Sequence, residues 1–397
     1  MKYFVNIFLL CQHIIFAQFV GIKNQSLNLN MKFRTANKKC TDGEGTVDYI
    51  IPPKLKNVFS TQSSLNEIKK NTPSDIYVEV LVVVDKILYE NVGKWYSKGI
   101  WNEYKHEINK SNLFPVGNPT EETVLYVRKF MTAVNFRYQG QFPNHNLKLH
   151  ISDILIDKKA TFVNKDEYYR NAVYTPGTLR NMVKHFGKKK ERNETHFDIV
   201  LFMTGEKKLC STNCSIKWNV DGKMKWKKLY VDGLTFSAGV CLPTTTDNPN
   251  DPYGPPIEHD YETYGAAIVH DKGSFFGVQT AAHKIGHVLG ALHDGHDNAC
   301  CSEDGYIMMD LYSLSRAKKG NVFKWSKCSS DAIISFINSA QAAKCLYNKP
   351  KTSFYPLMKW EELVAPNVPS LVKQCSFNYR EGIKVPPMKF YAAAYNF

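Results

Sequence analysis

Apolar runs and amphipathic stretches alternate along the middle of the chain. Residues 76–84 (IYVEVLVVV) and 198–204 (DIVLFMT) are rich in β-branched and other apolar side chains, which is typical of buried strands. Residues 147–155 alternate at first and then become fully apolar, which predicts another strand. Residues 121–137 carry apolar side chains at helical spacing, and the Thr-Pro pair at 175–176 can open a second helix through about residue 185. Strands and helices alternate, so the pattern predicts an α/β core.

The first residues have the pattern of a secretory signal. Lys2 precedes the mostly apolar segment 3–16, and Ala17 is a small residue suited to cleavage. The alternative is a buried N-terminal strand or helix. No later stretch approaches the ~18 consecutive apolar residues that a membrane-spanning helix needs. We therefore expect residues 1–17 to be a signal peptide and the mature chain to be secreted, with no transmembrane segment.

Composition narrows the class of protein further. The chain has 397 residues, of which 43% are hydrophobic and 22% charged, so a wholly disordered chain is excluded. The net charge of +14 allows nucleic acid, a membrane surface or an acidic glycan as partner. The basic runs 188–190 and 223–228 carry too few interleaved aromatic residues to indicate nucleic acid. We interpret both runs as solvated surface, and docking to anionic glycans or membrane is the alternative.

Cysteines and glycosylation sequons fit an oxidising compartment. Loss of the signal removes Cys11 and leaves nine of the ten cysteines. Because nine is odd, one cysteine is free, pairs between chains or is lost by processing. Four N-glycosylation sequons predict a glycoprotein, and they begin at Asn24, Asn109, Asn193 and Asn213.

One segment, residues 280–309 (TAAHKIGHVLGALHDGHDNACCSEDGYIMM), carries metal-binding chemistry. His283 and His287 are four residues apart, so a helix places both imidazoles on one face, one turn apart. Gly290 can end this helix in the left-handed conformation, which lets His293 return as a third ligand. Three imidazoles leave the fourth position of a tetrahedral Zn²⁺ to water, which is the layout of a catalytic site. The spacing disfavours the alternative of three ordinary histidines on a partly buried helix.

Lys284 departs from this chemistry. Zinc hydrolases of the His-Glu-x-x-His type carry a glutamate at this position, and it takes a proton from the zinc-bound water. A lysine with its usual pKa of about 10.4 is a cation and cannot accept that proton. Three interpretations stay open: a catalytically dead relative, weak activity from zinc alone or from a lysine neutralised by burial, and a sequence artefact or rare allele.

The chain from about 76 to 350 resembles the reprolysin (adamalysin) branch of the metzincins, and within it the secreted salivary metalloproteases of ticks. Asp294, directly after the third histidine, marks that branch, and Tyr306-Ile307-Met308 matches its Met-turn. The other matching segments are 78–85, 197–205, 233–241, 323–336 and 345–346. The resemblance implies an α/β metzincin fold with a twisted mixed sheet, two long helices, an active-site helix and Met308 as an apolar floor beneath the zinc.

Further expectations come from the resemblance alone. Glu79, Asp198 and Asn348 fall where some members bind a structural Ca²⁺. Residues 233–240 resemble the edge strand that takes substrate backbone by strand addition.

Two disulfides are also implied by the resemblance. Cys241 with Cys345 matches a family disulfide, and Cys328 is expected to pair with either Cys300 or Cys301.

The resemblance also divides the chain. We expect a short pro-segment or leader at residues 18–75, a metalloprotease domain at 76–350 and a tail at 351–397. The pro-segment carries Cys40, which is either a zinc-capping residue or, as its flanking residues favour, half of a plain disulfide.

The family function is that of an extracellular zinc endopeptidase, with extracellular proteins as substrates. With Lys284 at the position of the catalytic base, we expect this activity to be lost or weak. The alternative is a catalytically dead pseudoprotease that binds extracellular host proteins or anionic surfaces.

Overall fold

The structure is a computed structural model, and nearly all of its described residues belong to one compact unit, Cys40–Lys94 with Gly117–Leu357. The segments that it describes are 48–50, 73–97, 119–165, 172–191, 196–210, 215–220, 223–228, 230–242, 264–296, 298–310, 321–350 and 355–359. The expected signal peptide, the four sequons, Cys40 and the tail beyond residue 359 lie outside the described residues.

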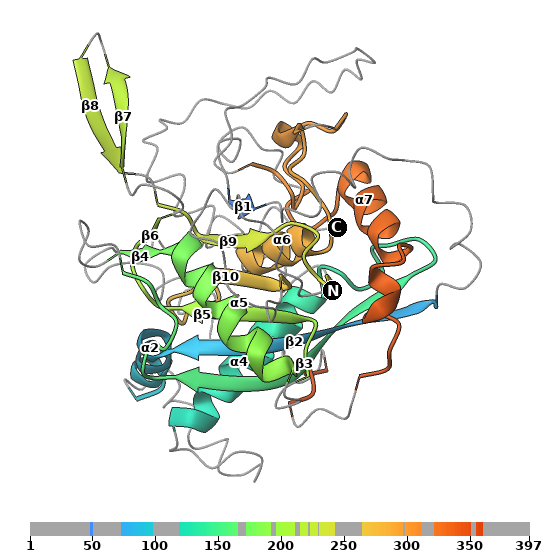
Figure 1. Ribbon diagram of the computed structural model, residues 1–397, viewed down its shortest axis with the longest axis horizontal. Coiled ribbons are helices and arrows are strands. Elements are labelled where there is room, and N and C mark those ends of the chain that lie inside the picture. Colours follow the sequence, from blue (N-terminus) through green and yellow to red (C-terminus); the bar gives the residue numbers. More distant parts are fainter. Residues whose placement is uncertain are drawn as a thin grey trace, which may run out of the picture. The chain divides into compact units, whose positions relative to one another are not determined.

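A six-stranded mixed sheet forms the centre of this unit (Figure 1). Four of its neighbouring pairs are parallel and one, β9 with β10, is antiparallel. In sheet order the strands are β1 (Tyr49–Ile50), β9 (Gly233–Phe236), β10 (Ala266–His270), β5 (Ile199–Thr204), β2 (Asp75–Asp85) and β3 (Asn146–Asp157). The three strands predicted from hydrophobic runs are therefore confirmed as β2, β3 and β5.

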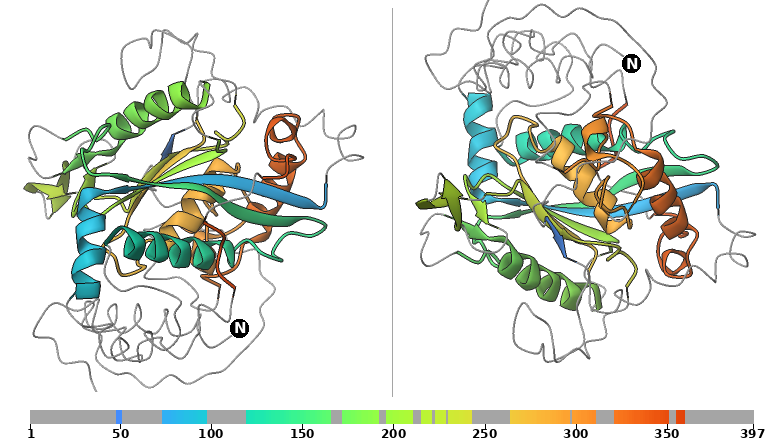
Figure 2. Two further views of the ribbon diagram at one scale, coloured as in Figure 1. Left: turned by 90° about the horizontal axis from the view of Figure 1, so that it is seen from below. Right: turned by 90° about the horizontal axis from the view of Figure 1, so that it is seen from above.

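Helices cover both faces of the sheet (Figure 2). Helix α5 (Thr175–Glu191) lies on one face, where its apolar side chains join those of β5, β9 and β10 in a buried core. Helices α4 (Pro119–Asn135) and α6 (Val278–Val288) lie on the other face. The two helices predicted from periodicity are confirmed as α4 and α5, and α6 is the predicted helix of the histidine motif.

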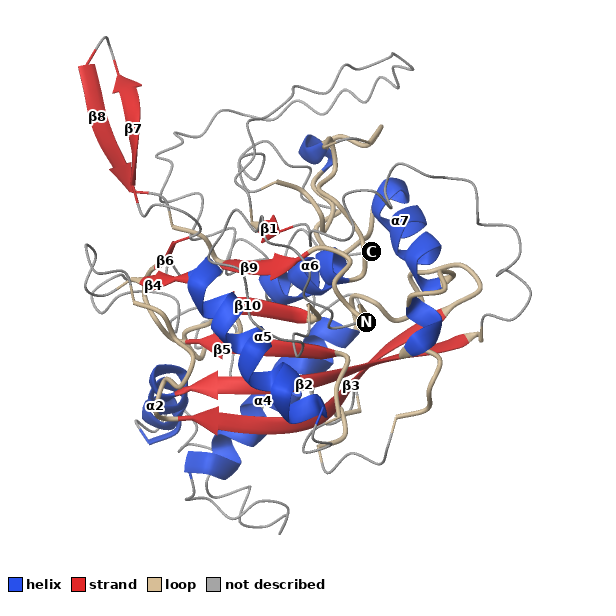
Figure 3. Cartoon of the chain, in the orientation of Figure 1, coloured by secondary structure: helices blue, strands red, loops and turns tan. Residues whose placement is uncertain are grey.

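The remaining elements are short or peripheral to the sheet (Figure 3). Helix α2 follows β2 directly, and the hydrophobic pattern did not reveal it. These elements are α2 (Lys86–Ser97), β4 (Val173–Tyr174), β6 (Leu209–Cys210), β7 (Ser215–Val220), β8 (Lys223–Lys228), η4 (Ser302–Asp304), α7 (Lys327–Ile337) and η6 (Ala342–Lys344). None of the described helices is long and apolar enough to cross a bilayer.

Two disulfides join cysteines that the structure describes on both sides, and both lie between residues 241 and 345. Cys241 pairs with Cys345, as the family resemblance implied. Cys328 pairs with Cys300 and not with Cys301, which resolves the open alternative. The second bridge joins the segment that follows the histidine motif to the first turn of α7.

Candidate metal centre

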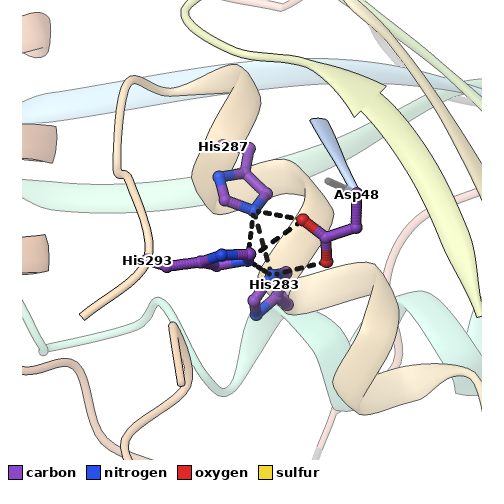
Figure 4. A group of neighbouring side chains, drawn as sticks. All are labelled: Asp48, His283, His287 and His293. Carbon is purple, nitrogen blue, oxygen red and sulfur yellow. Dashed lines mark hydrogen bonds and ion pairs between the residues drawn. The ribbon is translucent and has the colours of Figure 1, made fainter. Parts of the chain in front are cut away.

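Three histidine side chains converge at the C-terminal half of α6 (Figure 4). His283 and His287 project from one face of the helix, and His293 returns to them after the chain turns at Gly290, whose φ of 93° lies in the left-handed region. The Nε2 atoms lie 3.0 Å apart for His283 and His287, 3.1 Å for His283 and His293, and 3.2 Å for His287 and His293. All three side chains are buried, so the predicted triad is assembled as the spacing indicated.

Backbone carbonyls fix the tautomers of the two helical histidines. Nδ1 of His283 lies 2.8 Å from the carbonyl oxygen of Ile307, and Nδ1 of His287 lies 2.7 Å from that of Ala291. A carbonyl oxygen can only accept, so each Nδ1 carries the proton and each Nε2 keeps a lone pair. Burial lowers the pKa of His283 and lowers that of His287 well below its usual value, although Asp48 opposes both shifts. Both rings are therefore neutral near pH 7.

The Met-turn supports the helix from below. Ile307 supplies the carbonyl that orients His283, and Met308 is fully buried. A Cβ atom on Gly286 would lie 2.9 Å from Sδ of Met308 and 2.7 Å from the ring of Trp325, so only glycine permits this close packing. Met308 thus packs against the active-site helix at Gly286, and its role as an apolar floor beneath a zinc ion stays a prediction.

Asp294 links the histidine motif to the start of α7. Its backbone N–H donates to the carbonyl of Met308 at 2.9 Å. Its buried carboxylate accepts hydrogen bonds from the hydroxyls of Ser326 (2.5 Å) and Ser329 (2.9 Å). Ser326 is also the N-cap of α7. Asp294 therefore joins the turn after the third histidine to the Met-turn through its backbone and to the start of α7 through its carboxylate.

Asp48 is the fourth member of the cluster, and the sequence did not reveal it. Its Oδ1 atom lies 3.0 Å from Nε2 of His293 and 3.3 Å from Nε2 of His287. Its Oδ2 atom lies 3.3 Å from Nε2 of His283. Oδ1 is buried and accepts no hydrogen bond from any described residue. The carboxylate therefore faces the same point in space as the three imidazoles (Figure 4).

Lys284 is directed into this cluster. The side chain is only 2% exposed, and its ammonium donates to Oδ2 of Asp48 and, at 3.1 Å, to the backbone carbonyl of Asp48. Burial lowers the pKa of Lys284, and the Asp48 carboxylate opposes that shift. Burial would raise the pKa of Asp48, but the charge of Lys284, with a further effect of the neighbouring His283 and His287, holds it well below its usual value. Asp48 is therefore an ionised carboxylate with a buried cation as its partner.

The donor set and its spacing fit Zn²⁺. The three imidazole nitrogens and the carboxylate oxygen all lie within 4.8 Å of one another. Tetrahedral zinc with bonds of about 2.0–2.1 Å places its ligand atoms about 3.3 Å apart. The separations of 3.0–3.3 Å described above are close to that value. His283, His287, His293 and Asp48 could hold the metal without a rearrangement of the helix.

Strand β1 lies along β9, next to the cluster. Tyr49 pairs with Thr235 and Ile50 with Phe236 in parallel register, and the N–H of Ser237 donates to the carbonyl of Ile50 at 2.8 Å. Because β10 occupies the other side of β9, the expectation that residues 233–240 offer a free edge is wrong. That expectation failed because Tyr49 and Ile50 of the expected leader form a strand of the sheet.

Tyr49 also contacts the metal-site histidines directly. Its ring centroid lies 4.4 Å from that of His287 and 5.4 Å from that of His293. The apolar face of the tyrosine thereby covers the histidines on the side of β1.

The expected calcium ligands are only partly brought together. The N–H of Glu79 donates to the Asp198 carboxylate at 2.9 Å, and the N–H of Tyr77 donates to the carbonyl of Leu346 at 3.4 Å. These bonds bring the segments of all three residues into one region, where Asn348 is exposed. A calcium site here stays a prediction.

Comparison with known proteins gives one consistent family. Residues 260–350 match the model described as "Reprolysin (M12B) family zinc metalloprotease". The chain is 26% identical over 299 residues to "A disintegrin and metalloproteinase with thrombospondin motifs like" of Bombyx mori, covering 72% of this chain and 35% of that protein. It is 27% identical over 242 residues to "Venom metalloproteinase 3" of Eulophus pennicornis, covering 59% and 49%. The chain thus spans half or less of the length of these relatives.

Proposed function

Because this chain is a reprolysin-type metzincin, we propose that it is a zinc-binding protein that has lost endopeptidase activity. The observation that carries the proposal is the buried ion pair of Lys284 with Asp48. The position of the general base holds a cation, and that cation is already engaged with a carboxylate. A group in this state accepts no proton from water.

The rest of the site does not replace the missing base. Zinc bound by the three histidines would supply a Lewis acid and lower the pKa of a bound water. Asp48 is the only described carboxylate that contacts the cluster, and its pKa lies well below the usual value because of Lys284. A carboxylate of such low basicity is a poor general base near pH 7. Hydrolysis would then depend on the metal alone.

We propose that the protein acts outside the cell by binding rather than by cleavage. The signal-like residues 1–17 and the disulfides Cys241–Cys345 and Cys300–Cys328 support secretion. The net charge of +14 supports anionic glycans beside extracellular proteins as ligands.

Proteolysis of casein and gelatin by the purified chain tests the loss of activity. The native chain should release no fragments, with or without a chelator. Lys284→Glu combined with Asp48→Ala restores the base and removes the carboxylate from the site, and it should gain chelator-sensitive cleavage. Cleavage by the native chain that a chelator abolishes contradicts the proposal. Metal analysis of the same sample should find zinc, and its absence would remove the metal assignment.

A further inference from the structure

We infer that Asp48 is the fourth ligand of the metal centre and that Lys284 is the positioning residue that holds it there, so that the chain closes its own site. The inference rests on the proposed binding of zinc by the three histidines. It goes beyond that proposal because it assigns a ligand and replaces the open position of a protease with a closed centre.

Lone pairs of histidine nitrogens and of an Asp48 oxygen face one another across the cluster. The Nε2 atoms of His283 and His287 carry lone pairs, since their Nδ1 protons are donated to carbonyl oxygens. Oδ1 of Asp48 lies 3.3 Å from Nε2 of His287, and neither atom has a proton to share. Such an arrangement is repulsive unless a cation lies between the atoms. A divalent metal bound by all of them removes the repulsion.

The two oxygens of Asp48 have different tasks. Oδ2 accepts the hydrogen bond from the Lys284 ammonium. Oδ1 is buried and accepts no hydrogen bond from the described residues, although an ionised oxygen in that environment costs several kcal/mol of desolvation. Coordination of the metal by Oδ1 accounts for this otherwise uncompensated atom, while Lys284 fixes the carboxylate through the other oxygen.

Lys284 suits this role where a glutamate would not. A glutamate at position 284 would place a second buried carboxylate beside Asp48, and like charges at that distance repel. The lysine provides an opposite charge and also bonds the backbone carbonyl of Asp48 at 3.1 Å. Lys284 therefore both replaces the catalytic base and holds the fourth ligand in place.

The pairing of strand β1 with β9 also fixes the backbone next to Asp48. Strand β1 begins one residue later and is paired with β9, while the Tyr49 ring covers His287 at 4.4 Å. The strand thus occupies the edge that an incoming peptide would use, and the carboxylate occupies the position that an incoming water would use. A metal with four protein ligands has the layout of a structural site.

Cobalt substitution tests the ligand directly, because the visible spectrum of protein-bound Co²⁺ changes with its ligands. The full chain, loaded with Co²⁺, is compared with Asp48→Asn, Lys284→Met and Lys284→Arg, and with Asp331→Asn as a control on an exposed carboxylate. Asp48→Asn and Lys284→Met should change the spectrum of the native chain. Lys284→Arg, which keeps the positive charge, and Asp331→Asn should both give the native spectrum. Competition with a chromogenic chelator should show on the order of 10- to 100-fold weaker zinc binding in Asp48→Asn.

A measurement on the native chain tests the inference even if the variants do not fold. Acetohydroxamate, a small bidentate ligand of open zinc and cobalt sites, should leave the native Co²⁺ spectrum unchanged. A shift of the native spectrum on adding it, or a native-like spectrum and affinity in Asp48→Asn, overturns the inference while leaving the histidine site intact. A native chain that binds neither metal overturns the proposed function as well.

Discussion

The ammonium of Lys284 and the carboxylate of Asp48 form a buried ion pair between residues 236 positions apart in the chain. The pair joins the active-site helix α6 to the residue that precedes β1. It places a positive charge where a zinc protease needs a base, and this charge binds the Asp48 carboxylate. The two residues therefore connect the absence of a catalytic group with the closure of the site.

Removing the ammonium should destabilise the fold. Lys284→Met leaves Asp48 as a buried, unpaired carboxylate, and breaking such a pair costs about 3–5 kcal/mol. Chemical denaturation should report this loss in the free energy of unfolding. The double variant Lys284→Met with Asp48→Asn should recover part of it, because no unpaired charge remains. Lys327→Met removes an exposed partner of Asp331 and should change stability by less than about 0.5 kcal/mol. Equal effects in the two lysine variants would contradict the burial of the Lys284 pair.

Metal content should depend on the buried histidines and not on their exposed neighbour. His287→Ala removes a ligand that is held in place by the Ala291 carbonyl, so the purified variant should contain little zinc by elemental analysis. His296 lies three residues beyond His293 and is exposed. His296→Ala should retain the zinc of the native chain, and zinc loss in both variants would argue against the assigned ligands.

Acid should weaken the fold partly through His270. Burial, with a further effect of Lys272, lowers the pKa of His270 from 6.5 to about 4. The unfolded chain therefore binds more protons than the folded chain between these values, and the neutral histidine's contribution is complete above pH 6.5 and lost as the pH falls toward 4. Between pH 7 and pH 5 the loss is about 2 kcal/mol. His270→Asn should reduce the difference in unfolding free energy between these pH values by that amount, and an unchanged difference would refute it.

The bridge between Cys300 and Cys328 should stabilise the region below the metal centre. It closes a loop with a sequence separation of 28, for which chain entropy predicts about 3–4 kcal/mol. Replacing both cysteines with serine should lower the melting temperature and also weaken zinc retention, because Met-turn residues lie within the loop. Retention of native melting behaviour would show that the contacts of Asp294 suffice to hold α7.

The part of the site that the sequence predicts is local. His283, His287 and Gly290 follow from the geometry of one helix and its end, and His293 lies within one turn of the chain beyond them. The strands β2 and β5 likewise follow from continuous apolar runs, because both faces of these strands are buried.

Asp48 could not be found in this way, because its contacts depend on a strand pairing over a long sequence distance. Residues 18–75 are polar on average, and one acidic residue among them carries no local signal. The only sequence hint is the short run Tyr49-Ile50-Ile51 before two prolines, which is apolar enough to form a buried strand. Its partner, β9, is specified only by the folded sheet.

The most direct test of Asp48 as the fourth zinc ligand is a crystal structure of the zinc-loaded full chain with anomalous data at the zinc absorption edge. The account predicts an anomalous peak about 2.0–2.2 Å from a carboxylate oxygen of Asp48 and at similar distances from Nε2 of His283, His287 and His293. Lys284 should remain bonded to the other oxygen of Asp48. A zinc ion that carries water in place of Asp48, with β1 detached from β9, would contradict the closed centre.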